Sequence, residues 1–316
     1  MALLSTCGIQ IRPHGTDDPC GESRRQLTQS LNVNNTRFQS CVVAYSGQLT
    51  GRWWPQEDPV RNIDSDLQHA LLAAEPGVGI PLPELQPTID VAYAIQRRIA
   101  ARSALPVMVW KLGLTSQSAR DAFSASEPVV GRLAASAIYA DRSEIAFCQP
   151  EMYAEAEIVF EMGQDLPLQP EPYTREDLCG AIKGVYAGIE IVRSRFVESD
   201  LPLPLLIADN VMGHGLVLGR KLASIWDERF AAMSATLTRN AEAPVEGSTK
   251  RVMHDPLDAL VWLANWLRDN EQGSLKREQL IASGTCTGAT EIFSGDVIRV
   301  DFDGAEAARV SLRSSN

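Results

Sequence analysis

Ala154-Glu-Ala-Glu-Ile-Val-Phe160 is typical of a β-strand that carries acids on one face and apolar residues on the other. Side chains alternate between the two faces of a strand, so Glu155 and Glu157 point the same way. A second run, Val185-Tyr-Ala-Gly-Ile-Glu-Ile-Val192, is so apolar that it predicts a buried strand, and it carries Glu190 in its interior. An isolated charge is prohibitively costly to bury. The Glu190 carboxylate must therefore be neutral, paired with a cation or bound to a metal.

Apolar runs on either side of these strands predict the rest of the fold. Further strands are expected at Val107 to Leu112, Leu216 to Leu218, Ala232 to Thr238 and Val297 to Phe302. Helices are expected over Asp66 to Ala74, from an N-cap at Thr88 through Ile99, over Thr174 to Ile182 and over Pro256 to Leu267. Strands and helices do not strictly alternate, and no glycine-rich phosphate loop follows a strand. The pattern favours a mixed α+β sheet over a doubly wound nucleotide fold.

The composition is that of a globular protein with an excess of acids. The chain has 316 residues, of which 45% are hydrophobic and 22% charged, and its net charge is -11. Such a field repels phosphate backbones and anionic lipid, so neither nucleic acid nor a membrane is an expected partner. No apolar run approaches the roughly 20 residues that span a bilayer, and the first residues do not resemble a secretory signal. These observations predict a cytoplasmic protein whose six cysteines are reduced thiols.

The beginning of the chain differs in character from the rest. From Asp17 to Thr36 there are few large apolar groups and no sustained period, so this stretch cannot bury enough surface to offset its ordering entropy. We expect residues 1–62 to form a flexible N-terminal arm and residues 63–316 to form a single domain.

The three acids permit two interpretations. Glu155, Glu157 and Glu190 on neighbouring strands would supply hard oxygen ligands for Mg²⁺ or Mn²⁺, with further positions left for water and substrate. Alternating acids are also typical of the solvated face of a sheet, and Glu161 continues the same alternation. In that case Glu190 would pair with Arg193 or Arg195 instead of a metal. The spacing alone leaves both interpretations open.

Lys111 interrupts an otherwise apolar strand, Val107-Met-Val-Trp-Lys-Leu112. A buried lysine has its pKa lowered by desolvation or stays charged beside carboxylates, and either state suits proton transfer or anion binding. A lysine at a sheet edge, with its ammonium reaching into solvent, would give the same pattern.

Several motifs, in order along the chain, resemble the 2-keto-4-pentenoate hydratases and their 4-oxalocrotonate decarboxylase relatives. They are Ala92-Tyr-Ala-Ile-Gln96, Trp110-Lys-Leu-Gly-Leu-Thr-Ser116, Glu155-Ala-Glu-Ile-Val-Phe160, Gly188-Ile-Glu-Ile-Val192, Ser194-Arg-Phe196, Ile207-Ala-Asp-Asn210, Leu260-Val-Trp-Leu-Ala-Asn265 and Ser283-Gly-Thr-Cys-Thr-Gly288. The resemblance begins near Asp64 and leaves the N-terminal arm unmatched. It implies the fold of the fumarylacetoacetate hydrolase superfamily, a mixed β-roll flanked by helices, assembled into homo-oligomers.

The same resemblance implies roles for individual residues. Glu155, Glu157 and Glu190 would ligate a divalent ion that chelates a small 2-oxo acid, and Lys111 would be the active-site lysine. Asn210, Thr285 and Thr287 match segments that line the substrate, although turn and capping roles fit them equally well. For His214, a structural or surface role is the favoured interpretation.

One position departs from the hydratase pattern. The family carries an acid in a Pro-Asp-x-Gly segment, a candidate for proton transfer, whereas this chain reads Glu127-Pro-Val-Val-Gly-Arg132, with Val129 in place of the aspartate. Glu127 would face the same side if the segment is extended. Nothing in the sequence shows that it substitutes for the missing acid.

The leading prediction is an Mg²⁺- or Mn²⁺-dependent hydro-lyase that adds water to 2-hydroxypenta-2,4-dienoate in the catabolism of aromatic compounds. Decarboxylation of a 2-oxo-3-enedioate would need the same chelated enolate and stays open. Hydrolysis of an acylpyruvate is disfavoured, because no His-Glu pair for activating water is evident. The missing acid also leaves open a protein that binds 2-oxo acids without turnover.

Overall fold

The computed structural model describes residues 63–74, 78–103, 105–148 and 151–314. The predicted N-terminal arm, residues 1–62, lies outside the described residues. Within the described part, no helix is both long and apolar enough to cross a membrane. The three described cysteines, Cys148, Cys179 and Cys286, form no disulfide.

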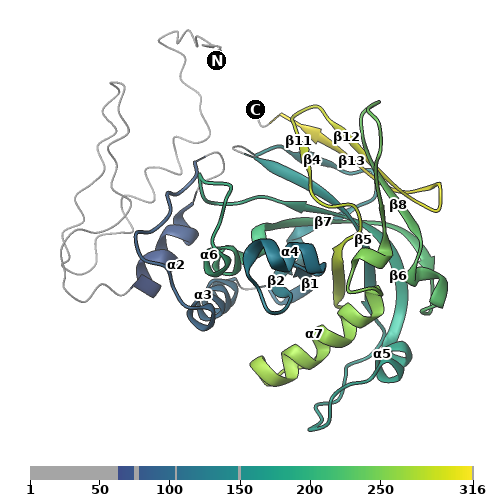
Figure 1. Cartoon of the computed structure of the whole chain (residues 1–316), viewed down its shortest axis with the longest axis horizontal. Helices are drawn as coiled ribbons and strands as arrows, with labels where there is room; N and C mark the ends of the chain where they lie inside the picture. Colours follow the sequence, from purple (N-terminus) through teal and green to yellow (C-terminus); the bar gives the residue numbers. More distant parts are fainter. Residues whose placement is uncertain (1–62, 75–77, 104, 149–150, 315–316) are drawn as a thin grey trace. The chain divides into compact units, whose positions relative to one another are not determined.

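Two sheets form the body of the described chain (Figure 1). The larger sheet has the strand order β2-β1-β10-β5-β6-β7-β3, and β11 pairs with β5. Its strands are β1 (Val107–Gly113), β2 (Val129–Ala134), β3 (Ile138–Ala140), β5 (Met152–Met162), β6 (Ile182–Val192), β7 (Gly213–Ala223), β10 (Leu280–Thr285) and β11 (Thr290–Ile292). The second sheet has the order β4-β13-β12-β8-β9, formed by β4 (Glu144–Ala146), β8 (Ser234–Arg239), β9 (Val245–Ser248), β12 (Val297–Phe302) and β13 (Ala305–Arg313).

The sheets pack face to face where β12 and β13 lie against β6 and β7. Gly219 on β7 allows the backbones of the two sheets to come close together. Any other residue would place its Cβ 2.5 Å from the Ala307 carbonyl oxygen. In Figure 1 the long strands β5, β6 and β7 bend strongly, and the registers of β5 with β6 and of β6 with β7 shift along their length. Bulges of this kind increase strand curvature, so the larger sheet wraps around part of the core.

Helices cover the larger sheet. They are α2 (Ile63–Ala73), α3 (Ile89–Arg102), α4 (Gln117–Phe123), α5 (Arg175–Ala181), α6 (Leu203–Ala208) and α7 (Pro256–Glu271). Helix α3 packs against α6, and α7 packs against β10 and α5. Asp255 caps α7 by accepting from the Leu257 N–H, and Leu257, Leu260 and Leu263 are buried along one side of it.

The mixed α+β architecture predicted from the sequence is confirmed. Strand β12 has the predicted bounds, and the predicted N-cap Thr88 accepts a backbone hydrogen bond from the Val91 N–H. Thr174, the first residue of another predicted helix, is the N-cap of α5. Strand β7 is longer than the predicted Leu216 to Leu218, because only its central residues are buried and its polar ends carry no apolar signal. Helix α4 was not predicted, since none of its side chains is buried and its sequence therefore shows no helical period.

Candidate active site

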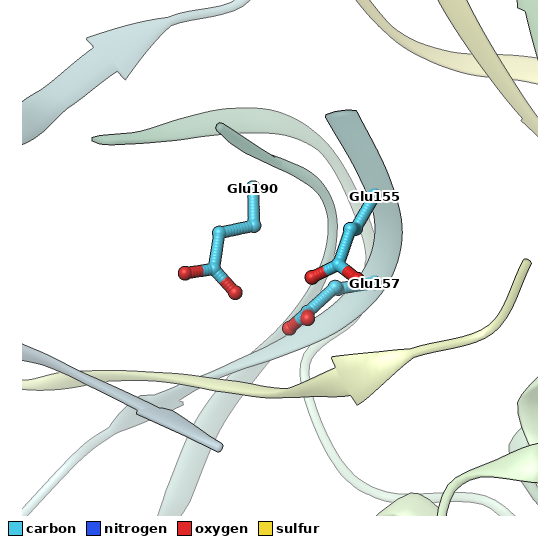
Figure 2. A group of neighbouring side chains, drawn as sticks. All are labelled: Glu155, Glu157 and Glu190. Carbon is cyan, nitrogen blue, oxygen red and sulfur yellow. The ribbon is translucent and has the colours of Figure 1, made fainter. Parts of the chain in front are cut away.

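Strands β5 and β6 bring three carboxylates to one point. The strands are antiparallel, with Glu155 opposite Glu190, and Glu157 lies two residues further along the same face of β5. One oxygen from each of these side chains can be chosen so that all three lie within 4.8 Å of one another. Figure 2 shows the three carboxylate groups turned toward a common centre.

Burying three ionised carboxylates together costs folding free energy unless a positive charge lies beside them. The side chains of Glu157 and Glu190 are fully buried, and Glu155 is partly buried. Burial raises the pKa of Glu157 well above its usual value, and the neighbouring Glu190 and Glu155 raise it further. Burial, and after it the charge of Glu190, raises the pKa of Glu155 to about 7.

The donor set fits a divalent cation. Glu157 Oε1 and Glu190 Oε2 are buried and have no hydrogen-bond partner among the described residues. Native proteins rarely leave buried carboxylate oxygens without a donor or an ion. Three carboxylates are the hard oxygen ligands that Mg²⁺ and Mn²⁺ prefer, and their charge would offset the desolvation of such an ion.

Lys111 on β1 completes the cluster. Its Nζ lies 2.9 Å from Glu190 Oε1 and donates to the Val211 carbonyl oxygen at 2.6 Å. The side chain is only 3% exposed, so the alternative that the Lys111 ammonium reaches into solvent is wrong. Glycines make room for its stem, because a Cβ on Gly131 or Gly213 would lie 2.8 or 3.1 Å from Lys111 Cδ. Glu190 therefore forms its ion pair with Lys111, whereas Arg195 forms one with Asp209.

Glu161 shows where the acidic face of β5 ends. It accepts hydrogen bonds from Lys183 Nζ at 2.6 Å and from the Tyr186 hydroxyl at 2.8 Å, and it lies outside the cluster. The two interpretations of the alternating acids therefore apply to different parts of one strand. Glu155 and Glu157 face the buried cluster, and Glu161 belongs to an ordinary polar surface.

The Gly284 loop supports the cluster through its backbone. The Gly284 N–H donates to Glu157 Oε2 at 3.0 Å. Gly284 has a φ of +114°, and a Cβ there would lie 2.3 Å from Thr115 Oγ1. This position needs glycine for both reasons. Its role was missed in the sequence, where the Ser283-Gly-Thr motif drew attention to the threonines instead.

The hydroxyls of the predicted substrate-binding threonines, Thr285 and Thr287, make hydrogen bonds to the backbone of their own turn and of β5. Thr285 lies opposite Glu157 in the β10–β5 register, and its Oγ1 accepts from the Gly288 N–H at 2.9 Å. Thr287 Oγ1 donates to the Gly288 carbonyl at 3.1 Å and accepts from the Ala156 N–H at 3.4 Å.

Asn210 makes a clamp onto β2. Its Oδ1 accepts from the Arg132 N–H at 2.9 Å, and its Nδ2 donates to the Arg132 carbonyl at 2.8 Å. Asn210, Val211 and Met212 have φ values of 58°, 54° and 57°, three consecutive left-handed residues without a glycine. Such strain persists only where surrounding contacts enforce it, and here it aims the Val211 carbonyl at Lys111.

A cavity of about 270 Å³ opens beside the cluster, with Lys111 and Glu155 in its wall. Its other lining residues are Gly113, Leu114, Phe123, Glu151, Tyr153, Val192, Ser194, Phe196, Val197, Glu198, Ser199, Leu206, Val211, Met212 and Ala289. Tyr153 could have been found from the sequence, because it precedes Glu155 by two residues and so shares its face of the strand.

A second cavity, of about 230 Å³, lies on the other side of the left-handed turn. Asn210, His214, Arg132, Arg193 and Arg195 line it. The predicted substrate residue Asn210 therefore faces this second cavity, apart from Lys111 and Glu155. Burial, followed by the charge of Arg193, lowers the pKa of His214.

Val129, the residue that replaces the family's aspartate, is buried next to the first cavity. A Cβ on the cavity residue Gly113 would lie 3.0 Å from Val129 Cγ2. Glu127 is exposed and is not among the described residues that line this cavity.

Sequence comparisons identify the family of this chain. Residues 109–312 match the model of the fumarylacetoacetate hydrolase C-terminal family. A 2-keto-4-pentenoate hydratase from Paraburkholderia xenovorans is 30% identical over 251 residues, which covers 75% of this chain and 90% of the relative. Another from Paraburkholderia phymatum is 32% identical over 193 residues, covering 58% of this chain and 72% of the relative.

Structural comparison shows the same fold. The 4-oxalocrotonate decarboxylase from Pseudomonas putida G7, solved in complex with magnesium and adipate, superposes with a TM-score of 0.67 and 23% identity. The match covers 79% of this chain and 95% of that one. The chain thus belongs to the fumarylacetoacetate hydrolase superfamily, in the family of the 2-keto-4-pentenoate hydratases.

Proposed function

We propose that this protein is a divalent-metal-dependent hydro-lyase that converts 2-hydroxypenta-2,4-dienoate and water into 4-hydroxy-2-oxopentanoate. The observation that carries the proposal is the buried Glu155-Glu157-Glu190 cluster with Lys111 at the wall of a cavity. The relatives named as 2-keto-4-pentenoate hydratases support the reaction type. The decarboxylase supports only the fold, although its magnesium agrees with a divalent ion at the carboxylates.

Each proposed site residue has a distinct task. Glu155, Glu157 and Glu190 would hold Mg²⁺ or Mn²⁺, which when bound supplies Lewis-acid stabilisation of negative charge on the substrate's 2-oxygen. Lys111, fixed by Glu190 and the Val211 carbonyl, places a positive charge beside the same oxygen and is the candidate for moving its proton. The Gly284 N–H holds Glu157 in place.

The proton balance defines what the site must do. A proton leaves the 2-hydroxyl of the dienol and one is added at carbon 5, giving an α,β-unsaturated ketone. Water then supplies hydroxide to carbon 4 and a proton to carbon 3. Valine has no side-chain proton to transfer, so with Val129 in place of the family's aspartate the proposed acid-base work falls on Lys111.

The test is turnover of the dienol by the full chain. With Mg²⁺ or Mn²⁺ present, we expect loss of the dienol's ultraviolet absorbance and appearance of 4-hydroxy-2-oxopentanoate by mass spectrometry. Removal of the ion with a chelator should stop the reaction. Carbon dioxide release from a 2-oxo-3-enedioate would instead establish the decarboxylase. A metal-loaded protein that binds oxalate tightly and turns over neither substrate would be a binding protein, and the proposal would be wrong.

The homo-oligomer implied by the family resemblance stays a prediction. Light scattering coupled to size-exclusion chromatography of the full chain measures it directly, independently of activity.

A further inference from the structure

The cavity beside the carboxylates has acids at both ends. Tyr153 and Glu155 occupy alternate positions at the start of β5, Glu151 comes directly before the strand, and all three line the cavity. At about 3.3 Å per residue, Glu151 lies roughly 13 Å along the strand from Glu155. Glu198, in the segment after β6, lines the same cavity. Both Glu151 and Glu198 are exposed, so they mark the end that opens to solvent.

No described residue at the opening supplies a counter-charge to these acids. Among the described residues that line the cavity, Lys111 alone carries a positive charge, and it is buried against Glu190 and the Val211 carbonyl. Glu151 is held toward Tyr153, whose hydroxyl donates to Glu151 Oε2 at 2.8 Å. This carboxylate and burial both raise the pKa of Tyr153, to about 12, so its hydroxyl stays a neutral donor at physiological pH.

The wall between the two acidic ends is largely apolar. Its side chains include those of Phe123, Val192, Phe196, Leu206 and Met212. One serine in this wall, Ser194, already uses its hydroxyl to accept from the Phe196 N–H at 2.9 Å. An aliphatic chain would lose no hydrogen bonds on entering this region, whereas a carboxylate would be desolvated beside two like charges.

We propose that Glu151 and Glu198 are specificity determinants, which restrict the site to 2-oxo acids with an uncharged far end and repel those with a second carboxylate. The inference rests on the proposed function, because it takes the 2-oxo carboxylate end to lie at the Glu155-Glu157-Glu190 cluster. This selection would distinguish the substrates of the two candidate reactions. The site would accept a dienoate with a hydrocarbon end and exclude an enedioate.

The test compares 2-oxo acids that differ only at the far end. Calorimetric titration of the full chain with Mg²⁺ would use 2-oxopentanoate against 2-oxoglutarate, and 2-oxohexanoate against 2-oxoadipate. In each pair the second acid replaces a methyl group by a carboxylate. We expect the uncharged member to bind at least about 10-fold more tightly, and the difference to shrink in high salt because exposed charges are screened.

Variants assign the effect to the two acids. Glu151→Gln and Glu198→Gln should each narrow the affinity ratio within a pair, mainly by improving the dicarboxylate. Both residues are exposed, so circular dichroism should show an unchanged fold. Glu246→Gln removes the same charge from an exposed position on β9, outside the cavity lining, and should leave the ratio unchanged.

The outcomes separate this inference from the proposed function. If no 2-oxo acid binds in the presence of Mg²⁺, the proposed function is wrong and the inference with it. If both members of each pair bind equally, or the dicarboxylate binds more tightly, the site stands and the inference is overturned. A ratio that responds equally to Glu246→Gln would also overturn it, because the whole-molecule charge would then be the cause.

Discussion

At the scale of single residues, the cluster shows why three acids can be buried together. Glu157 lies fully inside the protein with one oxygen bound by the Gly284 N–H and the other without a described partner. Lys111 compensates one negative charge, at Glu190, and leaves the rest of the cluster in need of a cation. Burying these charges is therefore costly in the absence of a cation, and the proposed divalent ion would offset that cost.

Glu157→Gln should affect the metal-free and the metal-bound protein in opposite ways. The substitution preserves shape but removes a buried charge and a proposed ligand. We expect Mn²⁺ binding, measured by calorimetry, to fall by at least about 100-fold and turnover to fall with it. The melting temperature of the metal-free protein should stay the same or rise, because the lost charge was repelled by its neighbours.

Glu161→Gln is the matched control for that experiment. Glu161 lies on the same face of the same strand but is paired with Lys183 and Tyr186. The control should leave Mn²⁺ affinity unchanged. Equal losses in the two variants would show that the cluster does not hold the ion.

At the scale of elements, the turn between α6 and β7 contacts both β2 and Lys111. Asn210 hydrogen-bonds the backbone of Arg132 on β2, and the Val211 carbonyl accepts from Lys111 Nζ. Three left-handed residues from Asn210 to Met212 cost about 1–2 kcal/mol each, and the Asn210 clamp onto Arg132 offsets part of that cost. The turn also separates the two cavities, since Val211 and Met212 line one and Asn210 the other. Its geometry therefore fixes the carbonyl that receives Lys111 Nζ.

Asn210→Ala should release this turn. Alanine removes both hydrogen bonds and tolerates the left-handed region less well than asparagine. We expect kcat to fall about 10- to 100-fold, as for other residues that orient a catalytic group, while the Kd for Mn²⁺ changes less than about 3-fold. A fall in Mn²⁺ affinity that parallels the fall in kcat would show that the turn supports the whole cluster and has no separate effect on Lys111.

Asn240→Ala provides the matched control at this scale. Asn240 is also left-handed, with a φ of 55°, and it clamps a turn of the second sheet through Val297 and Asp296. Its loss should lower the unfolding free energy by a similar amount, measured by urea titration, and leave kcat unchanged.

At the scale of the whole molecule, the buried acids link stability to pH and to metal. The folded protein holds the pKa of Glu155 at about 7, above the ordinary value of 4.5. A carboxyl with a raised pKa in the folded state contributes stability that is complete below its unfolded pKa and is lost as the pH rises through its folded pKa. The metal-free protein should thus lose stability, through this group, mainly between pH 4.5 and about pH 7.

Urea unfolding with a chelator, at pH 5 and pH 8, tests this linkage. The wild-type protein should lose more stability over this range than Glu155→Gln, which lacks the titrating group. Added Mg²⁺ should stabilise the wild type more at pH 8, because the ligands are then deprotonated. A Glu155→Gln variant with the same pH profile as the wild type would contradict the assignment.

The sequence by itself determined the periodic features of this protein. The alternation at Glu155 and Glu157, the apolar strand around Glu190 and the capped helix from Pro256 are local patterns, and each follows from the geometry of one element. Only the tertiary structure decided which elements meet. Glu190 pairs with Lys111 and not with a nearby arginine, and Asn210 clamps Arg132 and faces away from the carboxylates. These contacts join residues far apart in the chain, and their geometry depends on strand register, bulges and glycine approaches that no local pattern encodes.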